Sequence, residues 1–521
     1  MKKESSLSEE IIDVALVRGF VFPSAEIYGG AAGTYDYGPI GTLIKNKIVN
    51  LWRQRFIYEE TDHNIRIWEM SGSRLLPEPV FVASGHLEKF NDPLTQCKSC
   101  KKSFRVDHVL EDYEVEVTDG TPLEELTEKV KEVGAVCPKC KGELSEAREF
   151  NMMFKTQLGA TGGHNAYLRP ETAQNIFVSF RRLTHSMRAK LPFGIAQVGQ
   201  SYRNEISPRN FLIRMREFTQ MEIEYFVAPE HLIDYPKFDE VASSTIRLVT
   251  REMHEKGEKA MDIEVEEAVK QKLLPNQPIA YILALETEFL QLLGVPYEKF
   301  WFRHMSPEET AHYSGGNYDL EVDSDYGVIE IVGNAYRQDH DLQCHAKASK
   351  TKLRIEHDGK MIVPHVVEPS LGLDRIFYTV LESCYRNDET RTWTWFAFPP
   401  HIAPIEVAVF PLRKKPEELI ESTIELYLDL KDIGLDVFYD VSGNIGKRYA
   451  RADEIGIPFC VTMDLESSKD DCVTIRDRDS TDQVRVLTED LASILQMLID
   501  SELTFVELKE KYSIDEGLVE E

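Results

Sequence analysis

Residues 193–226, FGIAQVGQSYRNEISPRNFLIRMREFTQMEIEYF, decide how this chain folds. The stretch predicts two β-strands joined by a long polar loop. Two sets of side chains alternate along the second strand: an apolar set of Met221, Ile223 and Tyr225, and a set of Arg216, Phe218, Gln220, Glu222 and Glu224. Successive side chains of a strand point to opposite faces of its sheet. We therefore expect one face of this strand to be core and the other to carry a site.

The loop between the two strands is rich in arginine. The first strand brings Arg203 and Glu205 to its end, and the loop adds Arg209 and Arg214. The planar fork of a guanidinium group matches phosphate, a ring such as that of Phe218 can stack on a purine, and a strand carboxylate can hold a cation. The hairpin thus offers contacts for a nucleoside triphosphate and for an amine, although a charged strand face is more often merely exposed to solvent.

Two groups of residues in this hairpin match a known pattern. Arg203-Asn204-Glu205 followed by Arg216-Glu217-Phe218 resembles motif 2 of the class II aminoacyl-tRNA synthetases, in the version found in glycyl-tRNA synthetases. RPETAQ at 169–174 and EPSLGLDR at 368–375 resemble the same family. The resemblance extends over roughly residues 10–500 and implies an α+β fold with an antiparallel sheet flanked by helices.

The EPSLGLDR segment leads from a strand into a helix. Its β-run ends at Pro369, and Ser370 is typical of a helix N-cap. In the predicted helix, Arg375 lies about 200° around the axis from Leu373, the first residue of the apolar stripe. Arg375 therefore points to solvent or to an anion, and its resemblance to the arginine of motif 3 implies contact with the γ-phosphate of ATP.

Composition limits what the chain can do. Its 521 residues suffice for two to four domains, 42% of them are hydrophobic, and no run approaches the ~20 apolar residues of a membrane span. The N-terminus is charged and lacks the apolar core of a signal peptide, which favours a cytoplasmic location. A net charge of −29 argues against non-specific binding to nucleic acids, although a specific RNA could meet local basic patches.

Four of the eight cysteines form two C-x-x-C pairs, Cys97 with Cys100 and Cys137 with Cys140. Four thiolates are the tetrahedral set that a structural zinc ion prefers, and metal-free reduced cysteines are the alternative. The residues between the two pairs must fold back, and the sequence Thr121-Pro122-Leu123-Glu124 predicts a capping box at the start of a helix there.

The C-terminal part is predicted to be a compact α/β domain. Strands are expected at 405–412, 434–440, 458–464 and 471–477, and helices near 416–433, 446–456 and 488–501. Its segment 446–451, GKRYAR, combines positive charge with an aromatic ring. Such a segment is usually a solvated helix face, but the domain resembles the anticodon-binding domain of several class II synthetases, which favours contacts with RNA.

These patterns, together with the resemblance, divide the chain into seven segments. They are the first part of the catalytic domain with motif 1 (1–96), a zinc-binding insert that contains the four paired cysteines (97–140), catalytic domain with motif 2 (141–226), a helical insert (227–295), catalytic domain with motif 3 (296–398), the anticodon-binding domain (399–505) and an acidic tail (506–521). Motif 1 is carried by the turn at 35–41 and the amphipathic helix after it. Periodicity alone favours a core helix there, whereas the resemblance implies a homodimer interface that includes Pro39.

The resemblance also implies the residues of the site. For ATP they are Arg203, Asn204, Glu205, Ile213, Arg214, Met215, Arg216, Glu217, Phe218, Glu330, Ile331, Gly372, Leu373, Asp374 and Arg375. For glycine they are Arg105, Glu171, Phe218, Thr219, Gln220, Met221, Glu222, Glu368, Pro369, Ser370, Leu371 and Gly372. Catalytic roles are implied for Arg203 at the α-phosphate, Arg375 at the γ-phosphate and Glu330 beside Mg²⁺.

The implied activity is that of a glycine–tRNA ligase, with tRNA(Gly), glycine and ATP as partners and no membrane. Glycine and ATP give glycyl-adenylate and pyrophosphate, and the glycyl group passes to the 3′ end of the tRNA. A non-catalytic RNA-binding paralogue is the alternative from another class, and a threonyl or prolyl enzyme is the alternative among synthetases. Paralogues of that kind typically lose the phosphate arginines. Tyr336 departs from the family pattern, which usually has Asp or Asn before the arginine.

Overall fold

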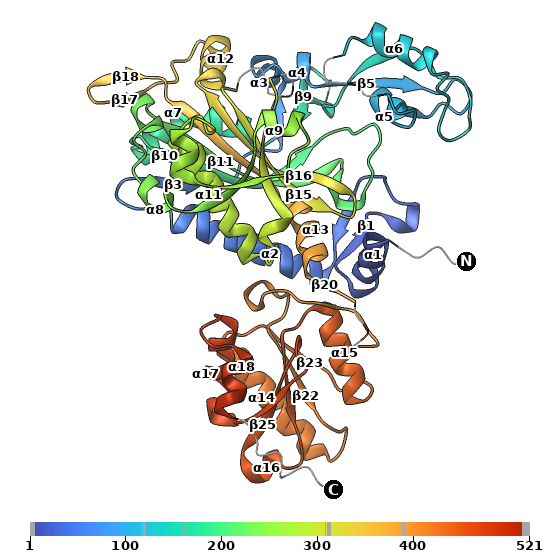
Figure 1. Ribbon diagram of the computed structural model, residues 1–521, viewed down its shortest axis with the longest axis vertical. Coiled ribbons are helices and arrows are strands. Elements are labelled where there is room, and N and C mark those ends of the chain that lie inside the picture. Colours follow the sequence, from blue (N-terminus) through green and yellow to red (C-terminus); the bar gives the residue numbers. More distant parts are fainter. Residues whose placement is uncertain are drawn as a thin grey trace.

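The computed structural model describes residues 6–115, 117, 121–160, 162–307, 309, 314–387, 389 and 391–512. Figure 1 shows a large body built on a central sheet, a smaller lobe at its upper right that holds α5 and α6, and a separate C-terminal lobe beneath the body. Residues 513–521 of the predicted acidic tail lie outside the described part of the chain. Within that part, no helix has the length and apolar character needed to cross a membrane.

A nine-stranded sheet forms the centre of the large body. Its order is β13 (Met261–Glu264), β12 (Thr245–Val249), β14 (Phe300–His304), β15 (Asn317–Ser324), β16 (Gly327–Gln338), β19 (His365–Gly372), β11 (Glu217–Val227), β10 (Phe193–Tyr202) and β3 (Arg66–Glu69). Strands β12 and β14 are parallel, as are β10 and β3, and the other neighbours are antiparallel. The predicted α+β class is confirmed.

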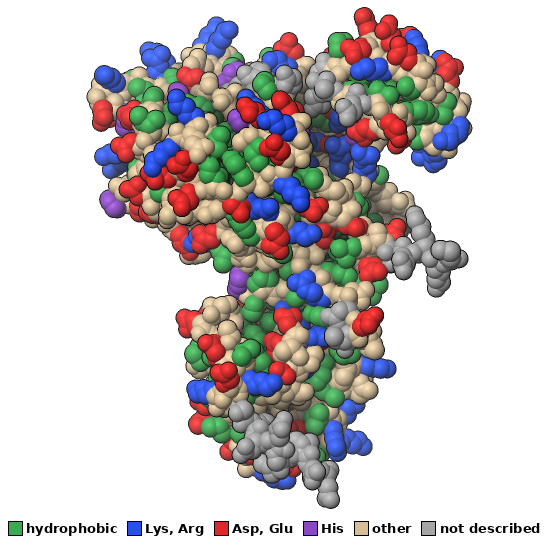
Figure 2. Space-filling model, in the orientation of Figure 1, with side chains coloured by type: hydrophobic (Ala, Val, Ile, Leu, Met, Phe, Trp, Pro, Cys, Tyr) green, Lys and Arg blue, Asp and Glu red, His purple; other side chains and the backbone are tan. Residues whose placement is uncertain are grey.

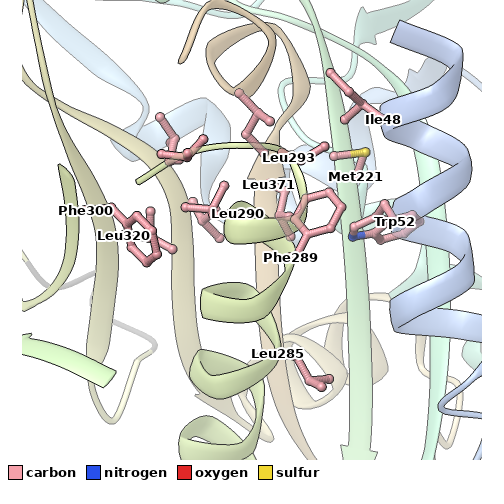
Figure 3. Packing of buried hydrophobic residues seen from close by; sticks show 14 of the residues in the cluster. Ile48, Trp52, Met221, Leu285, Phe289, Leu290, Leu293, Phe300, Leu320 and Leu371 are labelled. Carbon is pink, nitrogen blue, oxygen red and sulfur yellow. The ribbon is translucent and has the colours of Figure 1, made fainter. Parts of the chain in front are cut away.

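Three helices cover one face of this sheet: α2 (Pro39–Arg53), α11 (Gln277–Leu292) and α13 (Leu373–Cys384). Trp52 of α2, Phe289 of α11 and Met221 of β11 meet in a common core (Figure 3). All three side chains are fully buried, and truncation of a buried aromatic side chain costs about 3–5 kcal/mol. Met221 belongs to the apolar set of alternating residues that the sequence assigns to the core. The hairpin therefore turns its apolar face to the core, as predicted.

The opposite face is covered only in part, by α7 (Ala173–Met187) and α12 (His340–Ser349). Phe180 of α7 packs on Phe193 and Phe226, which are cross-strand partners in β10 and β11. Farther along the same face of β11, Glu222 and Gln220 take the positions that apolar residues occupy under the helix. This end of the sheet is therefore polar.

Strand β19, which pairs with β11, continues to Gly372, three residues beyond the predicted end at Pro369. Glu222 faces Ser370 across the β11–β19 pair, so Ser370 is a strand residue and not the predicted helix N-cap. Gly372, with extended backbone, caps α13 instead. The reason is that the hydroxyl of Ser370 bonds Glu222 across the sheet, which a helix cap could not do.

Residues 227–295 do not form the separate helical insert that the sequence predicts. They supply β12 and β13 to the edge of the sheet, and α11 packs in the core because almost all of its length is apolar and buried. The remaining elements are η4 (Pro229–Leu232), α8 (Phe238–Val241), α9 (Arg251–Glu255) and α10 (Val265–Lys270). The sequence did not predict β12 and β13, because both strands are short and the surrounding residues are highly charged.

The remaining elements of the large body are mostly short. They are α1 (Leu7–Arg18), β1 (Val21–Pro23), η1 (Glu26–Tyr28), β2 (Tyr35–Tyr37), η2 (Gln54–Tyr58), β4 (Leu75–Pro77), α3 (Glu78–Ala83), α4 (His86–Lys89), β8 (Lys155–Leu158), β9 (His164–Leu168), η3 (Phe211–Ile213), η5 (Tyr297–Lys299), β17 (Ile355–His357), β18 (Lys360–Ile362), β20 (Tyr385–Arg386) and β21 (Trp395–Phe396). Strands β4, β9 and β8 form a small sheet beside the polar end of the large one.

The upper-right lobe is the insert that carries the C-x-x-C pairs. It consists of β5 (Asn91–Gln96), β6 (Ser103–Arg105), α5 (Val106–Glu111), α6 (Leu123–Glu132) and β7 (Arg148–Asn151), with a small core of its own. Helix α6 begins at Leu123, and Pro122 is its N-cap without a side-chain hydrogen bond. The predicted capping box is therefore absent, because Thr121 lies one residue too far from the helix.

The C-terminal lobe contains a five-stranded sheet, and each of the four predicted strands is present. The order is β23 (Val437–Tyr439), β22 (Val407–Pro411), β24 (Phe459–Met463), β25 (Cys472–Asp477) and β26 (Gln483–Leu487). The helices are η6 (Pro400–Ile402), α14 (Glu417–Asp432), α15 (Ile445–Ile455), α16 (Ser467–Asp470), α17 (Thr488–Ile499) and α18 (Phe505–Lys511). Strand β26 and helices α16 and α18 were not predicted.

Two side chains of the basic segment of α15 hold the helix on the sheet, whereas Lys447 of the same segment is exposed. Arg448 is only 1% exposed, and its guanidinium donates to the carbonyl oxygen of Pro411. Tyr449 shares a hydrogen bond of 2.7 Å with Thr462. The prediction that this segment contacts RNA is wrong for these two side chains, because both are used to attach the helix to the sheet.

We predict that Gly41→Ala lowers the free energy of unfolding by about 1–3 kcal/mol, measured by urea denaturation. A Cβ atom at Gly41, in the first turn of α2, would overlap the backbone carbonyl of Phe20, which cannot move aside as a side-chain end can. Gly163→Ala is the matched control, because its Cβ would have no atom within 4 Å. Equal losses in both variants would contradict this account of the α2 start.

Candidate active site

Two arginines far apart in the sequence line one cleft. Arg203 directly follows β10, and Arg375 lies in the first turn of α13. The space between the walls of the cleft is about 680 Å³, including the part that is open to solvent. Its other lining residues are Glu205, Leu212, Ile213, Arg214, Met215, Phe218, Gln220, Glu330, Ile331, Gly333, Ser370, Gly372 and Asp374.

Both guanidinium groups are held in place by the walls of the cleft. Arg375 donates from Nε to the carbonyl oxygen of Ile213 (3.0 Å) and from Nη1 to the carbonyl oxygen (2.6 Å) and carboxylate (3.2 Å) of Glu330. Its side chain remains 30% exposed. Arg203 has its Cζ 5.1 Å from the centroid of the Phe218 ring. The cleft therefore offers two oriented cations and an aromatic face to an anionic, ring-bearing ligand.

Four residues predicted to contact the nucleotide do not line this cleft: Asn204, Arg216, Glu217 and Leu373. Leu373 is fully buried in the core on the other face of the sheet, so only its backbone could approach a ligand. Arg216 donates to the carbonyl oxygen of Glu205 at 3.1 and 2.9 Å, which fixes the loop. The other eleven predicted positions line the cleft, and they come from the strands, from the loop between β10 and β11, and from the start of α13.

The cleft continues through Gln220 and Ser370 to a buried carboxylate. Both side chains line the cleft, and both donate to Oε1 of Glu222, at 2.7 and 2.5 Å. On the far side, Thr172 donates to Oε2 of Glu222 from its backbone N–H at 2.9 Å and from its hydroxyl. Glu222 is only 1% exposed, and its four donors keep it in one position.

Glu171 and Glu368 flank Glu222 and share the cation Arg337. The guanidinium donates from Nη1 to Glu368 Oε2 at 2.7 Å, and its Nη2 lies 3.8 Å from Glu171 Oε1. It also makes a two-point contact with Asp341, at 2.8 and 3.0 Å. The pocket thus places four carboxylates, three of them buried, near one guanidinium. Such a surplus of acids favours a second cation, such as an ammonium group.

Burial and mutual repulsion set the protonation of these acids. Burial and the nearby charge of Glu171 raise the pKa of Glu222 above its ordinary value. Burial raises the pKa of Glu368 to about 7, although Arg337 opposes this. Burial would also raise the pKa of Glu171, but the charges of His86 and Arg337 lower it below its ordinary value. Of these three acids, Glu171 therefore gives up its proton most readily.

Four residues predicted for the amino-acid pocket turn their side chains away from it. They are Thr219, Met221, Pro369 and Leu371, which have the opposite parity to Glu222 and Ser370. Thr219 accepts a hydrogen bond from Lys45 of α2 at 3.0 Å, and Met221 and Leu371 lie in the core (Figure 3). Strand alternation leaves only their backbone to meet a ligand in the pocket.

Arg105 lies in the insert and does not line the cleft. Its guanidinium pairs with Asp92 at 2.7 Å and with Asp107 at 2.5 Å. The following helix reaches the arginine-rich loop, where His108 Nε2 lies 3.1 Å from Arg214 Nη1. In this structure the Arg105 segment therefore joins the insert to the cleft.

The acidic pocket includes residues that the sequence did not predict: His86, Gln174, Arg337 and Asp341. Arg337 had a visible signal, because an arginine inside an apolar strand is buried only with partners. The acids that pair with Arg337 could not be identified from the sequence, because they come from α12 and β19, which are distant in the chain. The neighbouring Tyr336 points elsewhere and bonds His365 at 2.6 Å, so its departure from the family pattern leaves the pocket unaffected.

Two carboxylates beside the cleft fit a divalent cation. A Cβ atom at Gly333 would lie 3.5 Å from Glu330 Oε1 and 3.9 Å from Asp319 Oδ1, so the two acids meet at this glycine. Burial and the charge of Glu330 raise the pKa of Asp319 to about 8. Paired carboxylate oxygens are the ligands that Mg²⁺ prefers. Asp319 was not predicted.

The two C-x-x-C pairs come together in the insert. The four sulfur atoms, of Cys97, Cys100, Cys137 and Cys140, all lie within 4.8 Å of one another. Both pairs form the same turn: the backbone N–H of Lys101 donates to the carbonyl oxygen of Cys97 (3.1 Å), and that of Lys141 donates to the carbonyl oxygen of Cys137 (2.9 Å). A closed set of four thiolates fits a structural zinc ion and leaves no position for catalysis.

Comparisons with known proteins agree with this geometry. Residues 154–384 match the family described as "tRNA synthetase class II core domain (G, H, P, S and T)", and residues 406–498 match "Anticodon binding domain". The glycine--tRNA ligases of Methanothermobacter thermautotrophicus, Methanocaldococcus jannaschii and Pyrococcus furiosus are 39%, 38% and 40% identical to this chain. These alignments cover 94%, 95% and 94% of the chain and 99% of each relative.

We predict about one zinc ion per chain in the purified protein, measured by elemental analysis, and a loss of that zinc in Cys97→Ser. Because a structural metal contributes folding free energy, this variant should also be cleaved faster by protease within residues 91–151. Cys472→Ser is the control, since that thiol lies in the C-terminal sheet outside the cluster. Wild-type protein without zinc but with a protease-resistant insert would contradict the prediction.

Proposed function

The chain belongs to the glycine--tRNA ligase family of class II aminoacyl-tRNA synthetases, and from that membership we propose which residues perform each part of the reaction. The enzyme activates glycine with ATP, giving glycyl-adenylate and pyrophosphate, and transfers the glycyl group to the 3′ end of tRNA(Gly). One observation carries the assignment: the cleft of Arg203 and Arg375 is continuous, through Gln220 and Ser370, with the pocket around Glu222.

ATP occupies the cleft. Arg203 holds the α-phosphate, Arg375 holds the γ-phosphate, and Phe218 stacks on the adenine ring. Glu330 and Asp319 would hold Mg²⁺, which when bound neutralises triphosphate oxygens. The fork of Arg375, aimed by its bonds to Ile213 and Glu330, needs little reorganisation to meet phosphate, and such preorganised donors contribute most where charge develops.

Activation requires positioning rather than a side-chain nucleophile. A carboxylate oxygen of glycine attacks the α-phosphorus, and the bond from that phosphorus to pyrophosphate breaks. Arg203 stabilises the charge on the α-phosphate, and Arg375 stabilises the charge on the leaving pyrophosphate. Loss of one such donor typically slows catalysis about 100- to 1,000-fold.

Glycine occupies the acidic pocket. Its ammonium group contacts the carboxylates of Glu171, Glu222 and Glu368 together with the hydroxyl of Ser370. The four donors to Glu222 hold this wall rigid, so a methyl group in place of the glycine hydrogen is excluded by sterics. No amino acid is smaller than glycine, so discrimination by size needs no editing step.

The C-terminal domain, which matches an anticodon-binding family, contacts tRNA(Gly), and we infer a cytoplasmic location. On the face shown in Figure 2, basic and acidic side chains of the described residues are interspersed. On this face, contacts with the tRNA would be made by local groups of cations, which also suits a chain with a net charge of −29.

A homodimer fits the edge of the large sheet that β3 forms. Strand β3 is the last strand of the sheet. Thr61 already bonds both the backbone N–H and the carbonyl oxygen of Ile67 in this strand, so side chains beside the edge, rather than an added strand, would form the contact. An apolar groove beside it is lined by Ile57, Tyr58, Thr61, Ile67, Trp68, Glu69, Met70, Leu183, Met187 and Ile195. A second copy of the chain would cover this groove next to helix α2, which resembles motif 1.

We predict that ATP–pyrophosphate exchange, measured with each of the twenty amino acids, responds to glycine alone. Glu222→Gln should raise the KM for glycine about 10- to 100-fold, because it removes a charged contact, with a much smaller effect on the KM for ATP. Arg375→Ala is the reciprocal control and should raise the KM for ATP more than that for glycine. No exchange with any amino acid would favour the non-catalytic alternative, and equal losses for both substrates would contradict the assigned pocket.

We predict a sedimenting species of twice the chain mass of 59.8 kDa at micromolar concentration. Met187→Glu should shift it towards the monomer, because a charge in the apolar groove opposes its burial. Val506→Glu is the control, since Val506 is 68% exposed on α18 in the other lobe. A wild-type monomer, or the same shift in both variants, would contradict an interface at β3.

A further inference from the structure

Glu224 is a buried carboxyl group, and neither of its oxygens receives a hydrogen bond from a described residue. It is fully buried on β11, two residues beyond Glu222 and on the same face of the sheet. An ionised carboxylate in this position would be strongly unfavourable, because it would lose its hydration without gaining donors. The reaction described above makes no use of Glu224.

The register of the sheet places Glu224 beside a residue of the glycine pocket. Strands β11 and β19 pair Glu222 with Ser370, and two residues farther along the same register Glu224 faces Glu368. Directly opposed residues have Cβ atoms about 4.5–5.5 Å apart, within reach of a contact between carboxyl groups. On the other side, β10 presents Ile195, an apolar side chain that offers no hydrogen bond.

Four charged groups act on Glu224, and they come from four different elements. Glu222 lies on β11, Glu368 on β19, Arg337 on β16 and Asp341 on α12. Three of the four are acids and therefore acceptors, and Arg337 donates to Glu368 and Asp341. A protonated Glu224 is the donor that suits this set of acceptors.

The titration of the pair is consistent with this arrangement. Burial and the charge of Glu368 raise the pKa of Glu224 well above its ordinary value. Burial, with the charges of Glu222 and Glu171, raises the pKa of Glu368 to about 7, while Arg337 lowers it. Two adjacent buried acids titrate as a pair, and one of them retains its proton where the other is ionised.

We propose that Glu224 is a neutral carboxylic acid in the working enzyme and that its O–H donates to Glu368, which keeps Glu368 ionised beside the ammonium group of glycine. Glu224 is then a positioning residue, because it touches neither glycine nor ATP and acts through Glu368. This inference rests on the proposed function, in which Glu368 contacts the ammonium group. It also explains why an acid with no donors of its own is tolerated in the sheet.

The pair makes glycine binding depend on pH in a defined direction. Below neutral pH, Glu368 takes up a proton and no longer attracts the ammonium group, so kcat/KM for glycine falls. A donor that bonds the ionised form lowers the pKa of Glu368. Without that donor, the pKa of Glu368 is higher, and kcat/KM for glycine begins to fall at a higher pH.

The test is the pH profile of kcat/KM for glycine in ATP–pyrophosphate exchange, for wild type, Glu224→Gln and Glu224→Met. Gln keeps a neutral N–H donor, whereas Met keeps a similar volume and removes the donor. We expect the midpoint of the acid limb to stay at its wild-type pH in Glu224→Gln. In Glu224→Met it should rise by about one pH unit, the size expected for one hydrogen bond to a charged group. The KM for ATP should show no such shift.

Two outcomes would overturn the inference. A midpoint that moves to lower pH in Glu224→Gln would mean that Glu224 is ionised and repels Glu368. Coincident profiles in all three proteins would mean that Glu224 only fills space. Wild-type protein without glycine-dependent exchange would instead refute the proposed function.

Discussion

One buried guanidinium group holds the acidic pocket together. Arg337 binds Asp341 at two points, donates to Glu368 and lies 3.8 Å from Glu171. Burial of several carboxylates without a cation would cost several kcal/mol for each, and removal of one partner from such a cluster typically costs about 3–5 kcal/mol. The cluster holds more acids than cations, and we propose that this surplus attracts the ammonium group of glycine. In the proposed function, glycine binding and its pH dependence both depend on this one cation.

The second organising feature is that one strand spans the whole site. Phe218, Gln220, Glu222 and Glu224 lie on one face of β11, and alternate residues of a strand are spaced by about 6.8 Å. The ring proposed for adenine, the link between the cleft and the acidic residues, the proposed ammonium contact and the buried acid therefore lie in that order within about 20 Å. The antiparallel neighbours β10 and β19 fix the register of this strand on both sides, so the spacing between the two substrates is set by the sheet itself.

Much of this could be predicted from local patterns, and the rest depended on distant partners. Alternation in β11 predicted which side chains face the site, and the motifs placed Arg203 and Arg375 correctly in one cleft. The role of Arg337 could not be predicted, because its acids come from α12, β19 and the RPETAQ segment. Ser370 was predicted as a helix cap, since its cross-strand bond to Glu222 has no local signal. Arg448 was misread because sequence alone cannot show that a cation is bonded to buried carbonyl groups.

The most direct measurement is a crystal structure with a non-hydrolysable analogue of glycyl-adenylate, in which a sulfamoyl group replaces the phosphate. The central claim is that one continuous site on β11 joins the arginine cleft to the acidic pocket. It predicts the amino group of the analogue against Glu171 and Glu222, the sulfamoyl group against Arg203 and the adenine ring on Phe218. An analogue whose amino group lies outside the acidic pocket, or whose adenosine binds away from Phe218 and Arg375, would contradict the claim.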